Sequence, residues 1–262
     1  MTIDLILYIL AATLGISFGS FMNVLVYRMP LEMNIANPPS ACPICKNELK
    51  WYHNIPVLSW IVLGAKCGFC KTKIPVIYPA LELLTGILAV FLLWLGLEYN
   101  GQAYWQIGLT FFFFYLYLTM AIIDYKTHLV SDYLNLPAAV LSIFLVGTTM
   151  SDFFHNFLIG GSVALFFYVF IIKIYPKIRG IEVMGEGDIP ILFGMAAVLG
   201  YYDFILGMLI ASLLGILFYV FKRDNELPFI PLLALATFIL FIVKSVDPIS
   251  NPIFQQITVM FS

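Results

Sequence analysis

Apolar residues fill eight long stretches of this chain, and short polar segments separate them. Most of the stretches contain about 20 residues, the length that an α-helix needs to cross the hydrocarbon core of a membrane. They lie near residues 3–26, 79–97, 104–123, 133–150, 156–175, 188–201, 203–221 and 229–246. The sixth is shorter and has Pro190 in its first turn, where a proline is tolerated. This pattern predicts an all-α polytopic membrane protein with about eight transmembrane helices.

The composition supports a membrane protein. Of the 262 residues, 62% are apolar and only 11% are charged, and the mean hydropathy is +0.98. Soluble domains have about 25% charged residues. The net charge of -2 gives no indication of nucleic-acid binding, so we expect membrane lipid and no nucleic acid as a partner. The first stretch lacks a basic start and is followed by Arg28, which predicts a retained helix and not a cleaved signal.

The basic residues indicate how the chain is oriented. With eight spans, one side of the membrane receives all of the following residues: Arg28, Lys46, Lys50, Lys66, Lys71, Lys73, Lys126, Lys173, Lys177, Arg179, Lys222 and Arg223. Only Lys244 falls on the other side. Because basic loops stay in the cytoplasm, we expect a multi-pass protein of the bacterial cytoplasmic (inner) membrane with both termini outside the cytoplasm.

The chain has one sizeable polar insertion, and it contains all four cysteines. We therefore divide the chain into a first helix (1–26), a cytoplasmic loop (27–78) and a membrane core (79–262). The cysteines form two Cys-x-x-Cys pairs with 21 residues between them: Cys42, Cys45, Cys67 and Cys70. Four thiolates at this spacing suit a tetrahedral structural zinc site, so a zinc-ribbon-like insertion is predicted. A disulfide pair is disfavoured on the reducing side, and a thioredoxin-like motif would need a βαβ context.

Two aspartates lie at the edges of apolar stretches. Asp124 follows an apolar run without a polar turn, and Asp188 closes the sequence Gly185-Glu186-Gly187-Asp188. An ionisable side chain near hydrocarbon costs about 2.5–3.5 kcal/mol on insertion scales, so it asks for a functional explanation. Two carboxylates held together share a proton and provide one general base and one general acid. The pair predicts an aspartyl protease site that opens toward the cytoplasm.

The glycines beside Asp188 allow a close backbone approach or a positive φ. An extended substrate could lie against this loop, which makes Gly185, Glu186 and Gly187 candidates for substrate binding. The alternative is a glycine-rich turn in which the aspartate caps the following helix. Asp132 and Glu82 compete as functional carboxylates: Asp132 could cap the helix near 133–150, and Glu82 lies close to the cysteine loop.

Several segments together resemble the type IV prepilin peptidases, which are membrane aspartyl proteases with a Gly-x-Gly-Asp motif. They are Gly19-Ser20-Phe21-Met22-Asn23-Val24 with Tyr27-Arg28-Met29-Pro30, the two cysteine pairs, Asn54-Ile55-Pro56-Val57-Leu58-Ser59-Trp60, Tyr78-Pro79 with Glu82-Leu83-Leu84-Thr85-Gly86, Asp124, Asp132, residues 185–188, and Leu227-Pro228-Phe229. Ordered agreement over most of the chain is more specific than any one of these motifs.

The resemblance implies a bifunctional enzyme. Members of the family remove the basic leader of a prepilin or pseudopilin, which also has an apolar helix, and many then methylate the new N-terminus with S-adenosylmethionine. Matching positions make Asp124 and Asp188 the protease pair. Methylation is associated with the N-terminal region, where Asn23, Arg28 and Glu82 are the candidates.

The chain departs from the family pattern at three places. Pro190 replaces a common lysine, Val130-Ser131 replaces a common Leu-Pro, and Ile230 replaces a frequent glycine. None of these changes removes a protease carboxylate.

Two other functions compete with proteolysis. A proton-coupled transporter would use the membrane-edge carboxylates as a relay, but it favours internal repeats and charges near the middle of a span. A non-enzymatic pilus or secretion assembly factor would dock through the zinc loop, and it leaves both aspartates unexplained.

Overall fold

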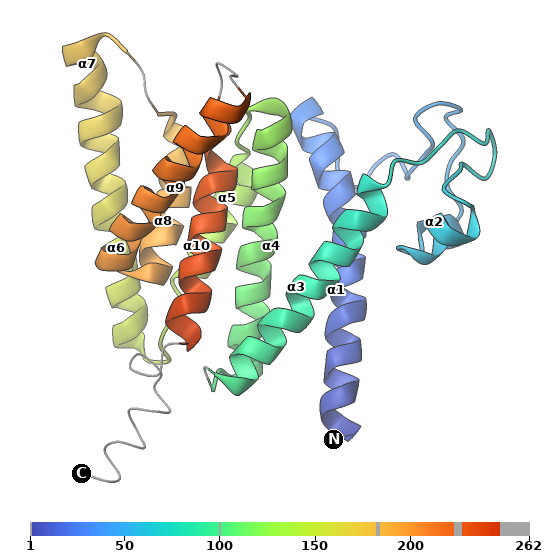
Figure 1. Ribbon diagram of the computed structural model, residues 1–262, viewed down its shortest axis with the longest axis horizontal. Coiled ribbons are helices and arrows are strands. Elements are labelled where there is room, and N and C mark those ends of the chain that lie inside the picture. Colours follow the sequence, from blue (N-terminus) through green and yellow to red (C-terminus); the bar gives the residue numbers. More distant parts are fainter. Residues whose placement is uncertain (1, 100, 182–183, 223–226, 247–262) are drawn as a thin grey trace. The chain divides into compact units, whose positions relative to one another are not determined.

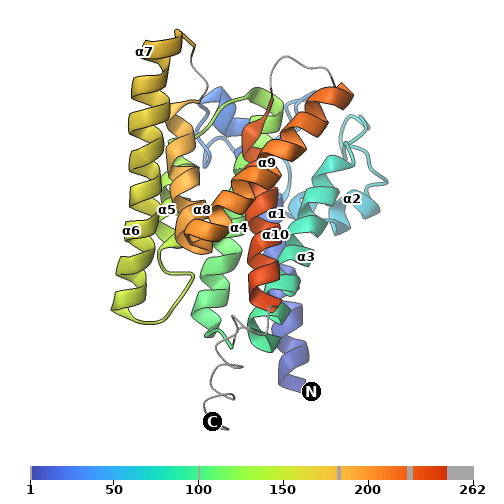
Figure 2. The same ribbon diagram turned by 60° about the vertical axis from the view of Figure 1, so that its left-hand side comes forward.

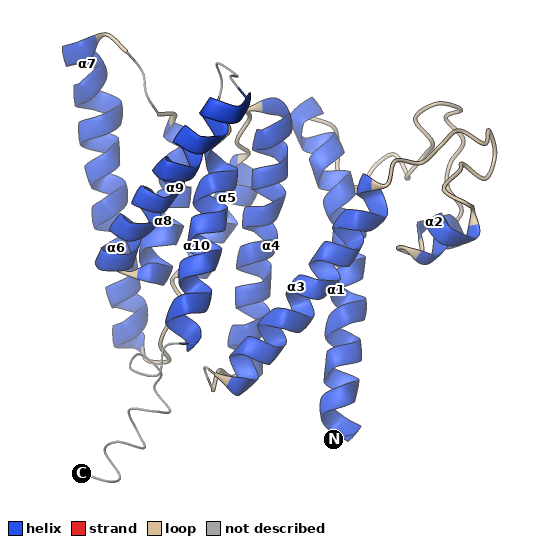
Figure 3. Ribbon diagram, viewed as in Figure 1, coloured by secondary structure: helices blue, strands red, loops and turns tan. Residues whose placement is uncertain are grey.

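The computed structural model describes residues 2–99, 101–181, 184–222 and 227–246. The chain divides into two units, residues 1–94 and 95–262, and each is described by itself. Helices dominate both units, and none of the described residues belongs to a named strand (Figure 3). The expected all-α class is therefore confirmed.

Unit 1 is built on two long helices, α1 (Thr2–Arg28) and α3 (Ile77–Glu98), the second of which continues into unit 2 (Figure 1). Glycines bring the two backbones into contact. A Cβ atom added at Gly15 would lie 2.6 Å from the Thr85 carbonyl oxygen, and one at Gly19 would lie 2.5 Å from the Glu82 Cα. Small residues at such contacts are typical of helix pairs in membranes, where van der Waals packing replaces hydrophobic burial.

The segment between these helices folds into a small lobe around the cysteines. It contains the 3₁₀ turns Met29–Leu31 and Trp51–Asn54 and the short helix α2 (Leu58–Val62). Isolated antiparallel bridges join Ala41 to Glu48 and Lys66 to Lys73, so each cysteine pair lies within its own tight loop.

Unit 2 is a helix bundle in which two short helices lie among longer ones (Figures 1 and 2). The elements are α4 (Tyr104–Thr127), α5 (Asp132–Ser142), α6 (Met150–Phe166), a π-helical segment (Phe167–Ile174), α7 (Tyr175–Arg179), a 3₁₀ turn (Glu186–Asp188), α8 (Ile189–Leu199), α9 (Tyr201–Lys222) and α10 (Phe229–Val246). Helix α8 packs against α5, α6, α9 and α10. It is apolar on all sides and eight of its 11 residues are buried, as expected of a helix at the centre of a core.

Six helices among the described residues are long and apolar enough to cross a membrane, which makes the chain a multi-pass membrane protein. They correspond to α1, α3, α4, the continuous run from α6 to α7, α9 and α10. The other two expected spans are α5 and α8, which have 11 residues each and are therefore about 16 Å long. The count of eight spans stays a prediction.

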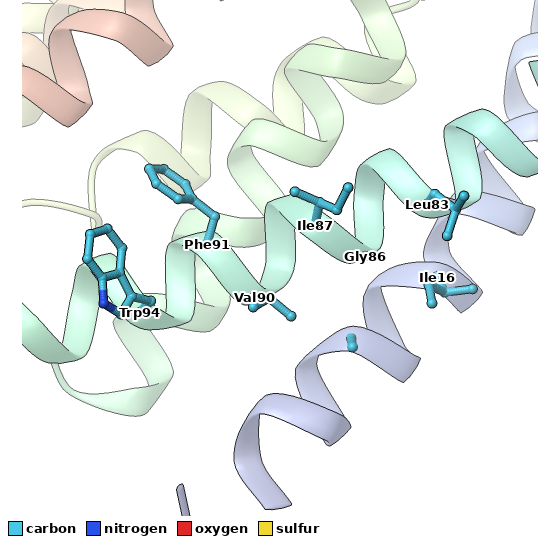
Figure 4. Close-up of a pocket in the computed structure, with 8 residues that line it drawn as sticks. Ile16, Leu83, Gly86, Ile87, Val90, Phe91 and Trp94 are labelled. Atoms are coloured by element: carbon cyan, nitrogen blue, oxygen red, sulfur yellow. The ribbon is translucent and has the colours of Figure 1, made fainter. Parts of the chain in front are cut away.

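An apolar groove runs along the α1–α3 pair of unit 1 (Figure 4). Its volume is about 410 Å³, and its walls are Ala12, Ile16, Leu83, Gly86, Ile87, Val90, Phe91 and Trp94. The absence of a side chain at Gly86 lets Ile16 approach the α3 backbone. This wholly apolar surface suits hydrocarbon.

The α1–α3 contact predicts that Gly19→Leu destabilises the protein. The new side chain would meet the α3 backbone, and overpacking of this kind costs about 1–3 kcal/mol. Gly161→Leu is the matched control, because a Cβ there has nothing within 4 Å. Both changes gain the same helix propensity. Thermal unfolding in detergent should show a lower midpoint for Gly19→Leu only, and equal midpoints would contradict the close packing.

Candidate active site and metal centre

Asp124 lies in the last turn of α4 and is buried, with 6% of its surface exposed. Its Oδ2 atom accepts a hydrogen bond of 3.0 Å from the backbone N–H of Ile230, in the first turn of α10. The N–H groups of a first helical turn have no partner within the helix, and the helix dipole favours a negative charge there. The α10 N-terminus therefore stabilises a carboxylate that the apolar bundle would otherwise disfavour.

Asp188 ends the 3₁₀ turn that precedes α8 and is partly buried. Two hydrogen bonds close this turn: Gly185 N–H donates to Asp188 Oδ2 at 3.3 Å, and Asp188 N–H donates to the Gly185 carbonyl at 3.2 Å. The Asp188 side chain therefore points back toward Gly185 and stabilises the turn that precedes it. Asp188 occupies the N-cap position of α8, but its side chain makes no cap hydrogen bond to that helix, so the expected cap of the following helix is not formed.

The structure places Asp124 and Asp188 near enough within unit 2 for their charges to interact. Burial raises the pKa of the Asp188 carboxyl, the Gly185 N–H opposes this change, and the charge of Asp124 raises the pKa further. The two residues are 64 positions apart in sequence and come from different helix ends. Burial and a neighbouring carboxylate both favour the protonated form of an aspartate, as expected of two carboxylates that share a proton.

Neither Gly185 nor Gly187 has a positive φ. Gly187 is instead packed closely against other residues. A Cβ at Gly187 would lie 3.2 Å from the Cβ of Val130. On the carbonyl side, Asn135 Nδ2 donates a hydrogen bond to Gly187. Glycine at position 187 is therefore explained by a close approach and not by a positive φ. Within the protein the approaching side chain is Val130.

Glu186 is exposed and forms an ion pair of 2.8 Å with Lys173. Lys173 belongs to the π-helical segment that follows α6, and its ammonium group also lies 4.9 Å from the centre of the Tyr168 ring. The cation that the family carries two positions after its aspartate is absent at Pro190, but Lys173 supplies a cation to the same loop from another helix.

The four cysteines of unit 1 form a cluster that could hold a metal ion. Their sulfur atoms all lie within 4.8 Å of one another, and Cys42 Sγ is 3.8 Å from Cys70 Sγ. Sulfurs bound tetrahedrally at about 2.3 Å from one ion lie at about this spacing. Both loops have the same backbone form, because the residue after each second cysteine, Lys46 or Lys71, has a φ near 60°.

The thiols resist full ionisation without a cation. Backbone N–H groups, first that of Cys45, lower the pKa of Cys42, and the Thr72 hydroxyl lowers the pKa of Cys70 to about 6. Although the Asn47 N–H acts in the opposite direction, burial and the neighbouring thiols raise the pKa of Cys45 to about 11. A divalent metal ion would offset the repulsion between neighbouring thiolates and favour the deprotonated form of each cysteine.

Glu82 and Asn23, two of the methylation candidates, lie at the α1–α3 contact. Glu82 is buried, and its Oε2 atom accepts a hydrogen bond of 2.7 Å from the backbone N–H of Val57. Asn23 Nδ2 donates to the carbonyls of Tyr78 at 3.3 Å and Gly19 at 3.2 Å. Glu82 therefore joins α3 to the cysteine lobe, and Asn23 joins α1 to the start of α3.

Val57, the partner of Glu82, has a strained backbone. Its φ is 61° and its ψ is -53°, a conformation that a β-branched residue rarely adopts. The Leu58 N–H bonds the Pro56 carbonyl at 2.6 Å, which makes the segment a tight γ-turn centred on Val57. Strain of this kind persists only where surrounding contacts enforce it, and here the Glu82 carboxylate provides one of them.

Arg28, the third candidate, is buried at the end of α1 with 8% of its surface exposed. Its guanidinium donates to three backbone carbonyls: Asn34 at 2.9 Å, Ile35 at 3.3 Å and Pro38 at 2.7 Å. These contacts order the segment that leads into the cysteine lobe, so the structure gives Arg28 a role in folding.

Asp132 does not cap its helix. Ser131 occupies the cap position, and Asp132 is the first residue of α5 and exposed. The sequence interpretation overlooked Asn135 and Lys173 as neighbours of the Gly185–Asp188 turn. Asn135 carried a signal, because it is an amide inside an apolar stretch, whereas Lys173 resembled any basic residue at a membrane edge.

The fold and these sites define a class: a multi-pass membrane protein with two interacting carboxylates in a helix bundle and a four-cysteine lobe. Comparison with known families then identifies the family. Residues 13–95 match the bacterial peptidase A24 N-terminal domain, and residues 111–220 match the type IV leader peptidase family. The chain belongs to the type IV leader peptidase family, which confirms the resemblance inferred from the motifs.

Several curated relatives support this membership. The chain is 30% identical to the prepilin leader peptidase/N-methyltransferase of Vibrio cholerae, with 82% of this chain and 86% of the relative covered. For the protein of the same name from Burkholderia pseudomallei the identity is 34%, with 78% and 73% covered, and for that from Neisseria gonorrhoeae it is 29%, with 88% and 89% covered. No significant match was found among solved structures.

The cysteine geometry predicts that the purified protein binds one metal ion and that Cys42→Ser or Cys67→Ser loses it. Because ligand thiols must be deprotonated, affinity should fall as the pH falls. Metal content by elemental mass spectrometry measures both effects. His53→Ala is the control, since His53 packs on Phe69 and Tyr52 in the same lobe and should leave the content unchanged. Full metal retention in both serine variants would exclude the site.

Proposed function

We propose that this chain is a prepilin peptidase that cleaves the leader of a prepilin or pseudopilin with Asp124 and Asp188 as its catalytic pair. The observation that carries the proposal is that Asp124, at the end of α4, lies near enough to Asp188, in the turn before α8, for its charge to act on that carboxyl. Membership of the leader peptidase family supports it.

In the proposed mechanism the two carboxylates share one proton. The ionised member takes a proton from a water molecule, and the water oxygen bonds to the scissile carbonyl carbon. The protonated member then donates its proton to the leaving amine as the carbon–nitrogen bond breaks. The Ile230 N–H stabilises the negative charge on Asp124, and the Gly185 N–H orients Asp188. The substrate backbone would lie along Gly185, Glu186 and Gly187.

The expected substrate has a basic leader and an apolar helix that stays in the bilayer. Glu186 is exposed beside Asp188 and suits a basic side chain, but Lys173 already pairs with it. A basic leader would therefore compete with Lys173 for this carboxylate. Glu182 is a second acidic residue that would attract a basic leader, and it lies outside the described residues.

We propose a second activity, N-methylation of the new N-terminus, because the curated relatives carry both activities in their name. When bound, S-adenosylmethionine supplies the methyl group. In unit 1, Glu82 fits a role beside the acceptor amine, since it is a buried carboxylate whose one described backbone donor is Val57. Asn23 and Arg28 would order the surrounding backbone.

The remaining proposals concern metal and membrane. We assign zinc to the four cysteines, because four thiolates with tetrahedral spacing suit zinc and leave no open position for catalysis. We place the protein in the bacterial cytoplasmic membrane with Asp124 and Asp188 facing the cytoplasm, as the basic residues indicate. Family membership disfavours the transporter and assembly-factor alternatives.

Asp124→Asn and Asp188→Asn should each lower the cleavage rate of a prepilin by about 10²- to 10⁴-fold, the range supplied by general acid–base catalysis. The assay uses purified protein in lipid and follows substrate mass. Asp203→Asn is the control, because Asp203 starts α9 and its carboxylate is about 40% exposed. Unchanged cleavage by both folded Asp124 and Asp188 variants would exclude the catalytic pair.

Glu82→Gln should abolish methylation and leave cleavage intact. The amide oxygen still accepts the Val57 N–H, so the turn is retained while the charge is lost. Mass spectrometry of the cleaved product distinguishes the two steps, because methylation adds the mass of one methyl group. The control is Glu98→Gln, at the exposed end of α3. A methylated product from Glu82→Gln would remove Glu82 from the site.

A further inference from the structure

The side-chain amide of Asn135 in unit 2 is buried, and its hydrogen bond goes to a residue outside its own helix. Asn135 lies at the end of the first turn of α5, and none of its surface is exposed. Its Nδ2 group donates to the Gly187 carbonyl, in the turn that ends at Asp188. Buried polar groups are disfavoured unless they are hydrogen-bonded, so this contact is a specific link between α5 and the candidate active site.

The contact fixes the orientation of the peptide that carries Asp188. Because a peptide unit is planar, the Gly187 carbonyl and the Asp188 N–H point in opposite directions. Asn135 holds the carbonyl end, and the Gly185 carbonyl accepts from the N–H end at 3.2 Å. Rotation of this peptide would therefore break both hydrogen bonds and turn the Asp188 side chain away from its present direction.

Packing on the other side of Gly187 restricts the same peptide. A Cβ at Gly187 would lie 3.2 Å from the Val130 Cβ, closer than side chains ordinarily pack. Val130 lies two residues before α5 and Asn135 lies within it, so α5 and the segment that leads into it both approach the turn. Helix α5 also packs against α8, which begins directly after Asp188.

The second polar atom of Asn135 has a different environment. Its Oδ1 atom is buried and finds no hydrogen-bond donor in the part of the chain that the structure describes. The amide cannot be turned around to change this, because only its NH₂ group can donate to the Gly187 carbonyl. An acceptor therefore remains beside the catalytic turn and suits a water molecule.

We propose that Asn135 is a positioning residue for Asp188: its NH₂ group holds the Gly187 carbonyl and thereby sets the direction of the aspartate. Its Oδ1 atom accepts a hydrogen bond from a water molecule at the same turn. This inference rests on the proposed peptidase function, because it assigns a role in the reaction through Asp188. It does not make Asn135 a catalytic residue.

The test compares Asn135→Leu with Asn156→Leu. Both asparagines are buried in unit 2 and donate to backbone carbonyls, but Asn156 bonds Ile143 at 3.0 Å and Val146 at 2.8 Å, in the connection between α5 and α6. Leucine has nearly the shape of asparagine and lacks the donor. Both changes therefore remove the same chemical group, and only Asn135→Leu removes it from the Asp188 turn.

We expect Asn135→Leu to lower kcat for prepilin cleavage by about 10- to 100-fold with little change in KM, since misplacing a reacting group by about 1 Å costs up to about 100-fold. Asn156→Leu should keep the wild-type kcat in its folded fraction, as determined by thermal unfolding. Asn135→Asp also lacks the NH₂ donor and serves where the leucine variant does not fold. A folded Asn135→Leu protein with wild-type kcat would overturn the proposal.

Hydrogen exchange supplies a readout that does not depend on activity. The Asp188 amide should exchange faster in Asn135→Leu than in wild type and Asn156→Leu, because its peptide is no longer held at the carbonyl end. If the wild-type protein cleaves no prepilin but this exchange difference is present, the peptidase function fails and the positioning contact stands. Equal exchange in all three proteins would overturn the contact itself.

Discussion

A carboxylate among apolar helices must receive hydrogen bonds from donors that the fold itself supplies, and unit 2 is organised around this requirement. Asp124 accepts from the first turn of α10, where a backbone N–H has no helical partner. Asp188 accepts from Gly185 in its own turn. These contacts require α4, α10 and the turn before α8 to meet at one end of the bundle. The same arrangement places the two acids where their charges interact.

Unit 1 meets the same requirement with different partners. The buried Glu82 carboxylate accepts from the strained backbone at Val57, and the buried Arg28 guanidinium donates to three carbonyls of the following segment. Both charged groups thus order the lobe that contains the cysteines. This lobe has few regular elements, so a bound metal ion would contribute much of its folding free energy. The Glu82 hydrogen bond also ties this lobe to α3.

The short helix α8 lies in the core of unit 2 and is hydrogen-bonded to α4. Helix α8 has Ile191, Leu192 and Met195 fully buried, and it begins immediately after the Asp188 turn. Tyr117 of α4 donates to the Ile191 carbonyl at 2.7 Å, which ties α8 to the helix that carries Asp124. Buried helices of this kind move little, because interiors are densely packed. The turn is therefore attached to a rigid element on one side and contacted by α5 on the other.

The sequence by itself determined the membrane class, the family and the candidate acids and thiols. Apolar length indicates a spanning helix, and cysteine spacing indicates a candidate metal site, because both signals are local. The family comparison confirmed the resemblance that the ordered motifs had indicated. The glycine at 187 was associated with a close approach, and within the protein Val130 approaches it closely.

Tertiary structure alone decided which groups meet. The Ile230 N–H reaches Asp124 across 106 positions, and Asn135 reaches Gly187 across 52, so no local pattern could reveal either contact. The 11-residue length of α5 also escaped the sequence, because hydropathy continues through Phe144 and Leu145 after the helix has ended, whereas the sixth stretch, which contains α8, was already short in the sequence. The hydrophobicity of the sequence predicts which segments are removed from water. It does not predict hydrogen-bond partners, because these depend on how the helices pack against one another.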